Sequence, residues 1–339
     1  MAAASTSSDA AVLAEADAAL GSALRSGDRA SRRRSLAKCI TLLESTRSDH
    51  RARADELLNA LLPYTGHSLR LGISGVPGVG KSTFIEALGL HLIGQGHRVA
   101  VLAIDPSSSL SGGSILGDKT RMERLSASED AYIRPSPASG TLGGVAEKTR
   151  EAMLVCEAAG YDVVIVETVG VGQSETAVAS MTDLFVLLQL PNAGDDLQAL
   201  KKGVTELADL IVVNKADLDP GAATRAQAQI ASSLRLFADH ENAPRVLLMS
   251  ALKNEGIEAF WAAIEAFAAQ RRADGRFERR RQQQAQAWMW DIVAARLKAD
   301  FRSHPAVRQV LPTTLQDVIA ARTAPSVAAR QLLNLFEKS

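Results

Sequence analysis

Residues 69–83 read LRLGISGVPGVGKST, and this stretch decides the fold class. An apolar run leads into the pattern G-x-x-x-x-G-K-S, and a helical pattern of apolar residues follows it. This is the P-loop sequence in the strand, loop and helix context that it requires. We therefore expect a buried strand, then a phosphate-binding loop, then a helix that begins beside the phosphates.

The residue types of the loop suit a nucleoside triphosphate. Glycines permit positive φ, which lets backbone N–H groups turn inward around phosphate oxygens. The following helix directs its positive dipole end at the same anion. A lysine at position 81 reaches the β- and γ-phosphates, and the next hydroxyl takes a Mg²⁺ position. The expected nucleotide-binding residues of this stretch are Gly75, Gly78, Val79, Gly80, Lys81, Ser82 and Thr83.

The chain around this loop alternates short apolar runs with helical stretches, which is typical of an α/β protein with a mostly parallel sheet. Most of the runs are continuous in Val, Ile and Leu, as in strands that are covered on both faces. In such a sheet, functional loops gather at the carboxyl ends of the strands. The predicted strands are Leu69–Ser74, Val99–Ile104, Val163–Glu167, Leu184–Gln189, Leu210–Asn214 and Arg245–Met249.

Four segments are expected from the pattern. Residues 1–10 predict a disordered tail, residues 11–66 a helical N-terminal extension and residues 67–270 the P-loop domain. Residues 271–339 predict a C-terminal helical arm with Trp288 and Trp290 on its apolar side. Exposed aromatic residues favour a dimerisation or docking role for this arm. Packing of the arm onto its own domain is the alternative.

Composition restricts the partners. The formal net charge of the 339 residues is zero, so we expect no general attraction to nucleic acid or membrane. The basic run Arg32–Arg34 is expected to be a solvated helix face. Two cysteines, Cys39 and Cys156, argue against a disulfide framework. No apolar run reaches membrane-spanning length, and the acidic residues near the N-terminus argue against a transit peptide, so the expected location is the cytoplasm.

Two carboxylates follow or end predicted strands near the P-loop. Asp105 ends the second strand, where it would hold Mg²⁺ through water or orient an attacking water. The alternative for Asp105 is a turn before Pro106. Glu167 ends the strand YDVVIVE, and a carboxylate there is the usual second Mg²⁺ anchor of a P-loop enzyme. Gly170, three residues later, leaves a backbone N–H for the γ-phosphate.

Two polar loops are candidates for mobile segments. Residues 107–122 are rich in Ser and Gly, and loops of this length in a compact domain are usually functional. We expect a switch segment there, with a plain insertion as the alternative. Residues 190–203 are either a further mobile segment or an ordinary helix start. Gln173 or Glu175 would position the hydrolytic water, and their spacing does not choose between them.

The sequence NKAD at residues 214–217 predicts selectivity for guanine. An Asp carboxylate accepts hydrogen bonds from both the ring N–H and the exocyclic amino group of guanine, and adenine offers no such pair. An unpaired carboxylate under ATP would be unfavourable. The expected base-binding residues are Asn214, Lys215 and Asp217, with Ser250, Ala251 and Leu252 after the next strand.

Several stretches together resemble one family, the methylmalonyl-CoA mutase-associated GTPases of MeaB/ArgK type, in the SIMIBI class of P-loop GTPases. The resemblance extends from about Leu36 to the C-terminal helices. The stretches are GVPGVGKST (75–83), AIDPSSSLSGGSILGDKTRM (103–122), RPSPASGTLGGVAEKTRE (134–151), ETVGVGQSE (167–175), PNAGDDLQALKKG (191–203) and NKADL (214–218).

This resemblance implies a GTPase with a C-terminal dimerisation arm that services an adenosylcobalamin-dependent acyl-CoA mutase. GTP binding and hydrolysis would gate cofactor loading and removal of damaged cofactor. Lys81 would act in catalysis with Asp105, Glu167 and Gln173, and the Mg²⁺ ligands would be Ser82, Asp105, Asp118 and Glu167. Residues 191–203 would communicate with the mutase, with Lys201 as a candidate contact. A cobalamin adenosyltransferase is a further candidate partner.

Two other functions compete with this interpretation. A small-molecule P-loop kinase would need no guanine selectivity, so Asn214 and Asp217 count against it. A nickel or cobalt insertion GTPase would need a metal site rich in Cys and His, which two isolated cysteines do not offer. The chain contains no Asp-x-His-x-x-Gly cobalamin motif, so we expect the mutase, and not this chain, to bind cobalamin.

Overall fold

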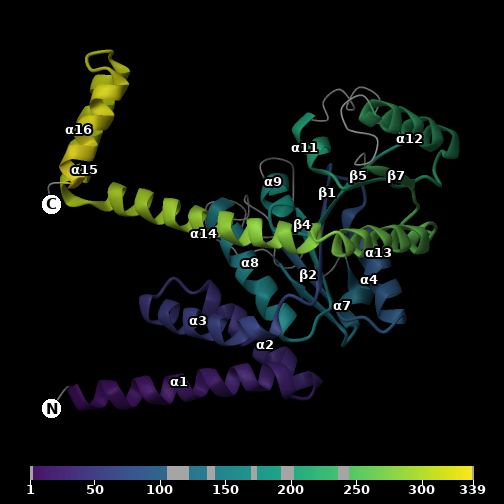
Figure 1. The fold of residues 1–339 in the computed structure, drawn as a ribbon, viewed down its shortest axis with the longest axis horizontal. Coiled ribbons are helices and arrows are strands. Elements are labelled where there is room, and N and C mark those ends of the chain that lie inside the picture. Colours follow the sequence, from purple (N-terminus) through teal and green to yellow (C-terminus); the bar gives the residue numbers. More distant parts are fainter. Residues whose placement is uncertain are drawn as a thin grey trace. The chain divides into compact units, whose positions relative to one another are not determined.

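A computed structural model of the chain describes residues 3–104, 122–135, 142–168, 174–191, 202–235 and 244–337. It divides into two compact units, Met1–Arg281 and Gln282–Ser339, which are described separately. The first unit holds one seven-stranded sheet (Figure 1). The strands are β1 (Leu69–Gly75), β2 (Val99–Ile104), β3 (Ala131–Arg134), β4 (Val163–Thr168), β5 (Leu184–Gln189), β6 (Leu210–Val213) and β7 (Arg245–Leu248).

The strand order is β3-β2-β4-β1-β5-β6-β7, and every pair of neighbours is parallel. The predicted α/β class with a parallel sheet is therefore confirmed. The P-loop strand β1 is central, between β4 and β5. Strand β3 was not predicted, because four residues that end in an arginine give no clear apolar run; pairing of Ala131 with Val99 of β2 fixes it as an edge strand.

Helices cover both faces of the sheet (Figure 1). One core joins the sheet to helices that include α4 and α13, where the rings of Phe84 and Phe260 meet edge to face at 5.1 Å. The other core joins the opposite face to α8, α9 and α12. The helices of these layers are α4 (Lys81–Gly94), α7 (Glu123–Ala127), α8 (Leu142–Ala158), α9 (Ser174–Ala179), α11 (Lys202–Leu207), α12 (Pro220–Arg235) and α13 (Ile257–Ala273).

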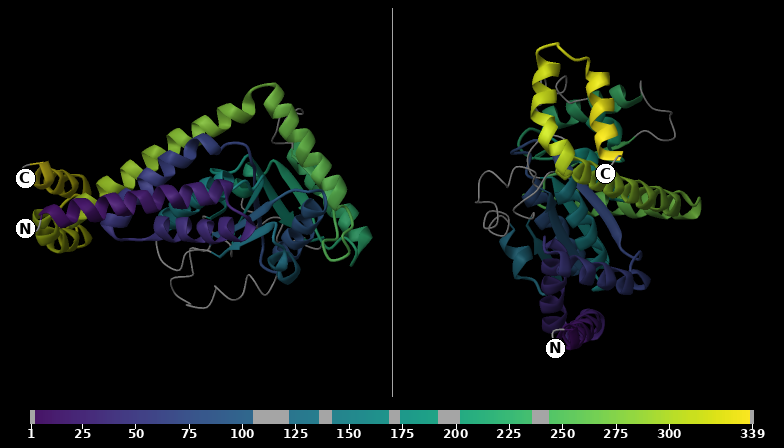
Figure 2. Two further views of the ribbon diagram at one scale, coloured as in Figure 1. Left: turned by 90° about the horizontal axis from the view of Figure 1, so that it is seen from below. Right: turned by 90° about the vertical axis from the view of Figure 1, so that its left-hand side faces the viewer.

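The N-terminal extension consists of α1 (Ala3–Ser26), α2 (Arg29–Glu44), α3 (Ser48–Leu61) and a 3₁₀ turn, η1 (Leu62–Tyr64). Helices α2 and α3 pack on α8 (Figure 2). Asp28 caps α2 by accepting the Ser31 N–H at 2.7 Å. Helix α1 begins at Ala3, inside the segment 1–10 for which we expected disorder. Alanine has the highest helix propensity, and this segment is rich in it.

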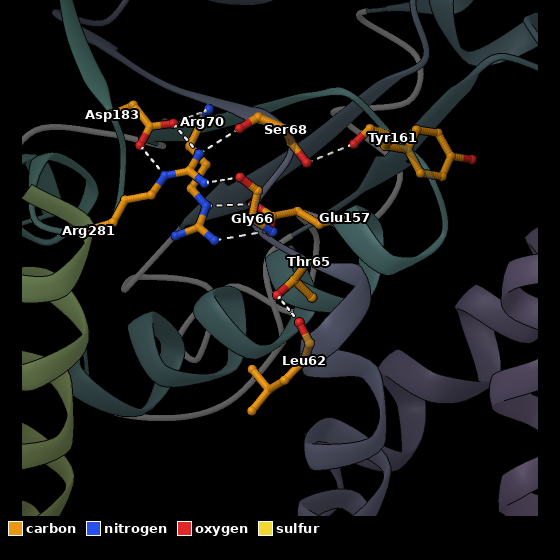
Figure 3. Close-up of polar contacts among 9 residues, drawn as sticks. All are labelled: Leu62, Thr65, Gly66, Ser68, Arg70, Glu157, Tyr161, Asp183 and Arg281. Carbon is orange, nitrogen blue, oxygen red and sulfur yellow. Dashed lines mark hydrogen bonds and ion pairs between the residues drawn. The ribbon is translucent and has the colours of Figure 1, made fainter. Parts of the chain in front are cut away.

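Buried ion pairs join the amino edge of the sheet to the segments around it (Figure 3). The Arg281 guanidinium donates to both oxygens of Asp183 at 2.7 Å and to the Gly66 carbonyl at 2.6 Å. Arg70 of β1 donates to Glu157 of α8 at 2.5 Å, and Glu157 also accepts the Gly66 N–H at 2.7 Å. These contacts extend the first unit to Arg281, eleven residues beyond the domain end expected at 270.

The second unit contains most of α14 (Arg276–Ser303), α15 (Pro305–Ile319) and α16 (Pro325–Glu337). Helices α15 and α16 lie side by side (Figure 2). The Phe336 ring meets Phe301 at 5.5 Å and His304 at 5.3 Å, so α16 closes onto the end of α14. Among the described residues, no helix has the length and apolar character needed to span a bilayer.

Candidate functional site

The P-loop leaves β1 between the carboxyl ends of two other strands. In the parallel register Ile73 lies beside Glu167 of β4, and Gly75 lies beside Leu188 of β5. A Cβ atom on Gly75 would stand 2.7 Å from the Leu188 carbonyl oxygen, so only glycine fits there. Gly78 and Gly80 have φ angles of 78° and 95°, which side chains disfavour. The loop therefore has the shape that turns N–H groups inward.

The amino end of α4 has no side-chain cap. Gly80 is its N-cap residue, and the first hydrogen bond runs from the Phe84 N–H to the Gly80 carbonyl at 2.9 Å. The N–H groups of the first turn, at Lys81, Ser82 and Thr83, have no intrahelical acceptor. The Lys81 ammonium donates to the Gly75 carbonyl at 2.7 Å, which holds this cation across the loop. N–H groups without an intrahelical acceptor, a helix dipole and an ammonium group together suit an anion.

Oxygen donors lie on the β4 side of the loop. Glu167 is on β4 with its side chain buried, and Ser82 is on the first turn of α4. Beside them, the hydroxyls of Ser74 and Thr168 hydrogen-bond at 2.9 Å and tie β1 to β4. Carboxylate and hydroxyl oxygens at a phosphate site fit Mg²⁺, which takes one or two carboxylates together with substrate phosphates. The donor set of the described residues therefore suits this ion.

Four predicted residues lie outside the described part of the chain: Asp105, Asp118, Gly170 and Gln173. Lys201 lies outside it as well. Glu175, the alternative to Gln173, is buried in the first turn of α9. Over the described residues, no group of three or more His, Cys, Asp or Glu side chains is arranged to hold a metal ion.

Asn214 connects the P-loop to the loop after β7. Its side-chain amide donates to the Val79 carbonyl at 2.9 Å, and its amide oxygen accepts the Ala251 N–H at 3.1 Å. A Cβ atom on Gly80 would lie 2.9 Å from the Asn214 nitrogen, so glycine is needed for this close approach. Lys215 has a φ of 59°, and its ammonium donates to the Gly78 carbonyl at 2.8 Å. The two motifs thus form one structure.

Asp217 is placed to accept hydrogen bonds as a carboxylate. The hydrogen bond from the Ser250 hydroxyl lowers its pKa most, and the charge of Lys253 acts in the same direction. The Lys253 ammonium lies 3.8 Å from the Asp217 carboxylate. The Leu252 side chain, in the same loop, is 78% exposed and offers an apolar surface beside these polar groups. An ionised carboxylate next to an apolar surface suits the edge and face of a purine base.

The structure brings together the P-loop, Glu167, the NKAD sequence and the loop at 250–252, which the sequence predicted separately. It adds three residues that sequence reasoning did not select: Ser74, Thr168 and Lys253. Ser74 and Thr168 lie at the carboxyl ends of adjacent strands, one residue after the paired Ile73 and Glu167, so a correct strand register would have placed them together. Lys253 follows Ser250 by three residues in a tight loop, and no sequence pattern marks it.

Comparisons with known proteins agree with this geometry. The family model described as "Methylmalonyl Co-A mutase-associated GTPase MeaB" matches residues 36–306. A Caulobacter vibrioides protein named "Putative GTPase" is 51% identical over 92% of this chain and 95% of its own length. The mouse "Methylmalonic aciduria type A homolog, mitochondrial" is 46% identical over 89% of this chain and 76% of its own. A crystal structure titled "LAO/AO transport system kinase" superposes with a TM-score of 0.77 at 40% identity, covering 95% of this chain and 97% of that one.

Proposed function

The chain belongs to the family of methylmalonyl-CoA mutase-associated GTPases and is a GTP hydrolase, and from this premise we propose that it serves an adenosylcobalamin-dependent acyl-CoA mutase. In this proposal the bound guanine nucleotide sets the state of the loops at the carboxyl edge. The mutase detects that state, so GTP binding and hydrolysis gate cofactor loading and the replacement of damaged cofactor.

Each residue of the site then has a role. The loop from Gly75 to Thr83 and the first turn of α4 hold the phosphates through N–H groups. Lys81 stabilises the charge that develops on the β,γ-bridging region as the γ-phosphate leaves. Ser82 and Glu167 would hold Mg²⁺, with Asp105 and Asp118 as further proposed ligands. The ion, when bound, supplies positive charge to the phosphate oxygens.

One observation carries the proposal most strongly. The Asn214 side chain bonds both the P-loop, at Val79, and the loop after β7, at Ala251. The residues proposed for the phosphates and those proposed for the base are thereby held in one rigid arrangement. Asp217, whose pKa is lowered mainly by the hydrogen bond from Ser250, accepts the two guanine N–H groups in this proposal. A P-loop kinase for small molecules would have no use for this arrangement.

The mutase association rests on the family description and on the mouse relative, whose name refers to methylmalonic aciduria. The sequence contains no Asp-x-His-x-x-Gly cobalamin motif, so in this proposal the partner supplies the cobalamin site. Residues 191–203, which follow β5 at the carboxyl edge, are the segment that we propose for contact with the mutase. The adenosyltransferase that supplies the cofactor is a second proposed partner.

We also propose a homodimer formed through the C-terminal unit. Helix α14 carries exposed apolar side chains at helical spacing, namely Met289, Trp290, Val293 and Leu297. A stripe of this kind on a solvated helix favours burial against a second copy. The two cysteines are free, buried thiols, which is consistent with a reducing compartment such as the cytoplasm.

The test is the rate of GTP hydrolysis by the purified chain, alone and with each candidate acyl-CoA mutase. We expect the cognate mutase to raise the rate, and Lys81→Ala to remove both the basal and the stimulated rates. Failure of every acyl-CoA mutase to bind or to change the rate would reject the mutase proposal. It would leave the GTPase assignment in place.

A further inference from the structure

A cavity of about 230 Å³ lies at the amino ends of β5, β6 and β7, against α13 and the start of α14. A water molecule needs only about 10–15 Å³ of such volume, so the cavity accommodates a ligand much larger than water. Its lining includes Asp209, Arg245, Arg271 and Arg276, together with an apolar wall that contains Ala263 and Phe267. All of these residues belong to the first unit.

The cavity is separate from the nucleotide site. Arg245 begins β7 and Asp209 directly precedes β6, whereas the proposed guanine site follows the far ends of these strands. A strand of four residues at about 3.3 Å per residue spans about 13 Å, so the two sites lie at opposite edges of the sheet. None of the residues assigned to the nucleotide lines the cavity.

Positively charged side chains outnumber negatively charged ones in the lining of the cavity. Asp209 accepts from the Phe185 N–H at 2.9 Å, from Arg271 at 3.1 Å and from Arg280 at 3.3 Å. Its carboxylate is therefore fully engaged. Arg276 is paired with Asp274 at 2.6 Å. Arg245 is exposed, and its side chain makes no ion pair or hydrogen bond with any residue that the structure describes.

Three guanidinium groups and one carboxylate line the cavity, which leaves an excess of two positive charges. Counting Arg280, which pairs with Asp209, and Asp274, which pairs with Arg276, does not change this excess. The pKa of Arg271 is lowered, mainly by burial. The positive charges of Arg280 and Arg276 lower this pKa further, whereas the negative charge of Asp209 raises it. An anion in the cavity would relieve both effects. The Arg271 guanidinium also lies 4.1 Å from the Phe267 ring centre, which holds it beside the apolar wall.

We propose that this cavity binds a small organic phosphate. The phosphate group lies among Arg245, Arg271 and Arg276, whose planar donors match phosphate oxygens. A phosphate monoester carries close to two negative charges at pH 7, which balances the excess. The organic part of the ligand packs on Ala263 and Phe267. This site adds a second ligand to the chain, at the edge of the sheet that the GTPase reaction does not use.

Titration calorimetry with phenyl phosphate tests the proposal, because this probe combines a phosphate with an apolar ring. The chain is first saturated with GDP and Mg²⁺, so that the P-loop is blocked. We expect one further site per chain, with weaker binding of inorganic phosphate, which lacks the ring. Arg245→Gln should weaken phenyl phosphate binding about tenfold or more, since one charge-assisted hydrogen bond is lost.

Arg225→Gln is the matched control, because Arg225 is an exposed arginine of α12 outside the cavity lining. Binding that is unchanged in Arg245→Gln, or weakened equally in both variants, would overturn the proposal, as would the lack of any second site. The initial GDP titration reports separately on the proposed nucleotide site. Its failure would leave the phenyl phosphate result interpretable, because the two sites share no residue.

Discussion

Two regions of the sheet use polar groups in different ways: the ion-pair network of Asp183 and Arg281 at the amino edge, and the P-loop at the carboxyl edge. At the amino edge, Asp183 and Arg281 are buried and neutralise each other, and backbone atoms of Gly66 and Ser68 take up remaining bonds (Figure 3). At the carboxyl edge, the first turn of α4 has N–H groups without an intrahelical acceptor, and the Lys81 ammonium lies across the loop on the Gly75 carbonyl. The Asp217 carboxylate, which we propose for the base, lies beside Ser250 and Lys253.

This difference separates groups that stabilise the fold from groups that bind a ligand. Buried charges that satisfy one another cannot be removed singly without a large loss of stability. Side chains that bind a ligand can be removed with little loss of folding stability, and their removal lowers the affinity for the ligand. Variants in the Asp183–Arg281 network should therefore lower the free energy of unfolding, whereas variants in the P-loop should lower the rate of nucleotide turnover.

The largest effect is expected from Asp183→Ala. This change removes the carboxylate that neutralises the largely buried Arg281 guanidinium, which keeps the Gly66 and Ser68 carbonyls as acceptors. It also removes the acceptor of the Arg70 N–H, so we expect a loss of about 3–5 kcal/mol in the free energy of unfolding. Urea denaturation followed by circular dichroism measures it. Asp300→Ala, which removes the exposed pair with Arg296, should cost only about 0.3–0.5 kcal/mol. Similar losses in both variants would contradict the assignment of the amino edge to stability.

Lys81→Ala should have the second largest effect, and only on turnover. Loss of a charge that stabilises the transition state should slow GTP hydrolysis about 100- to 1000-fold, by analogy with the removal of one oxyanion-hole donor. The unfolding free energy should stay within about 0.5 kcal/mol, as expected for a site away from the core. Single-turnover kinetics and urea denaturation on the same preparation separate the two. An unchanged rate would reject the P-loop assignment.

Asp217→Asn should change which base is bound. The amide cannot accept both guanine N–H groups, so GTP affinity should fall about tenfold or more. Xanthosine triphosphate has a carbonyl oxygen where guanine has its amino group, and the new amide nitrogen donates to it. The ratio of the two affinities, measured by competition, should therefore move toward xanthine. If the ratio stays constant, Asp217 does not contact the base.

Ser74→Ala should have the smallest effect. It removes the buried hydrogen bond to Thr168, which is worth about 0.5–1.5 kcal/mol of stability. Because this bond lies beneath the phosphate loop and not in it, nucleotide affinity should change by less than about threefold. Thermal unfolding and GDP titration give the two values. A loss of affinity much larger than the loss of stability would show that the pair acts directly on the nucleotide.

The carboxyl edge was more predictable from sequence than the amino edge, for a physical reason. GVPGVGKS and NKAD are each an unbroken stretch of sequence, because a loop that surrounds a ligand takes its donors from successive residues. Strands β2 and β5 were predictable as apolar runs, and β1 from the apolar residues Leu69, Leu71 and Ile73 that lead into the P-loop. The amino-edge network joins Gly66, Glu157, Asp183 and Arg281, which only the fold brings together.

Ion pairs between distant residues also set the boundary of the C-terminal arm. Helical patterns in the sequence change near residue 270, where the arm was expected to begin. The first unit continues to Arg281, because Arg271 and Arg280 pair with Asp209 and Arg281 pairs with Asp183. From the sequence alone, RFERRRQ indicates only a polar helix segment, because its partners Asp209 and Asp183 lie far away in the chain. The ion pairs between residues far apart in the chain are thus the part of the structure that could not be predicted from the sequence.

The most direct test of the central claim is the position of GDP in crystals of the chain grown with GDP and Mg²⁺. The account predicts the diphosphate against residues 75–83, the metal beside Ser82 and Glu167, and the guanine edge on the Asp217 carboxylate. GDP bound elsewhere, for example with its phosphates in the arginine-lined cavity at the amino edge and the P-loop empty, would contradict it.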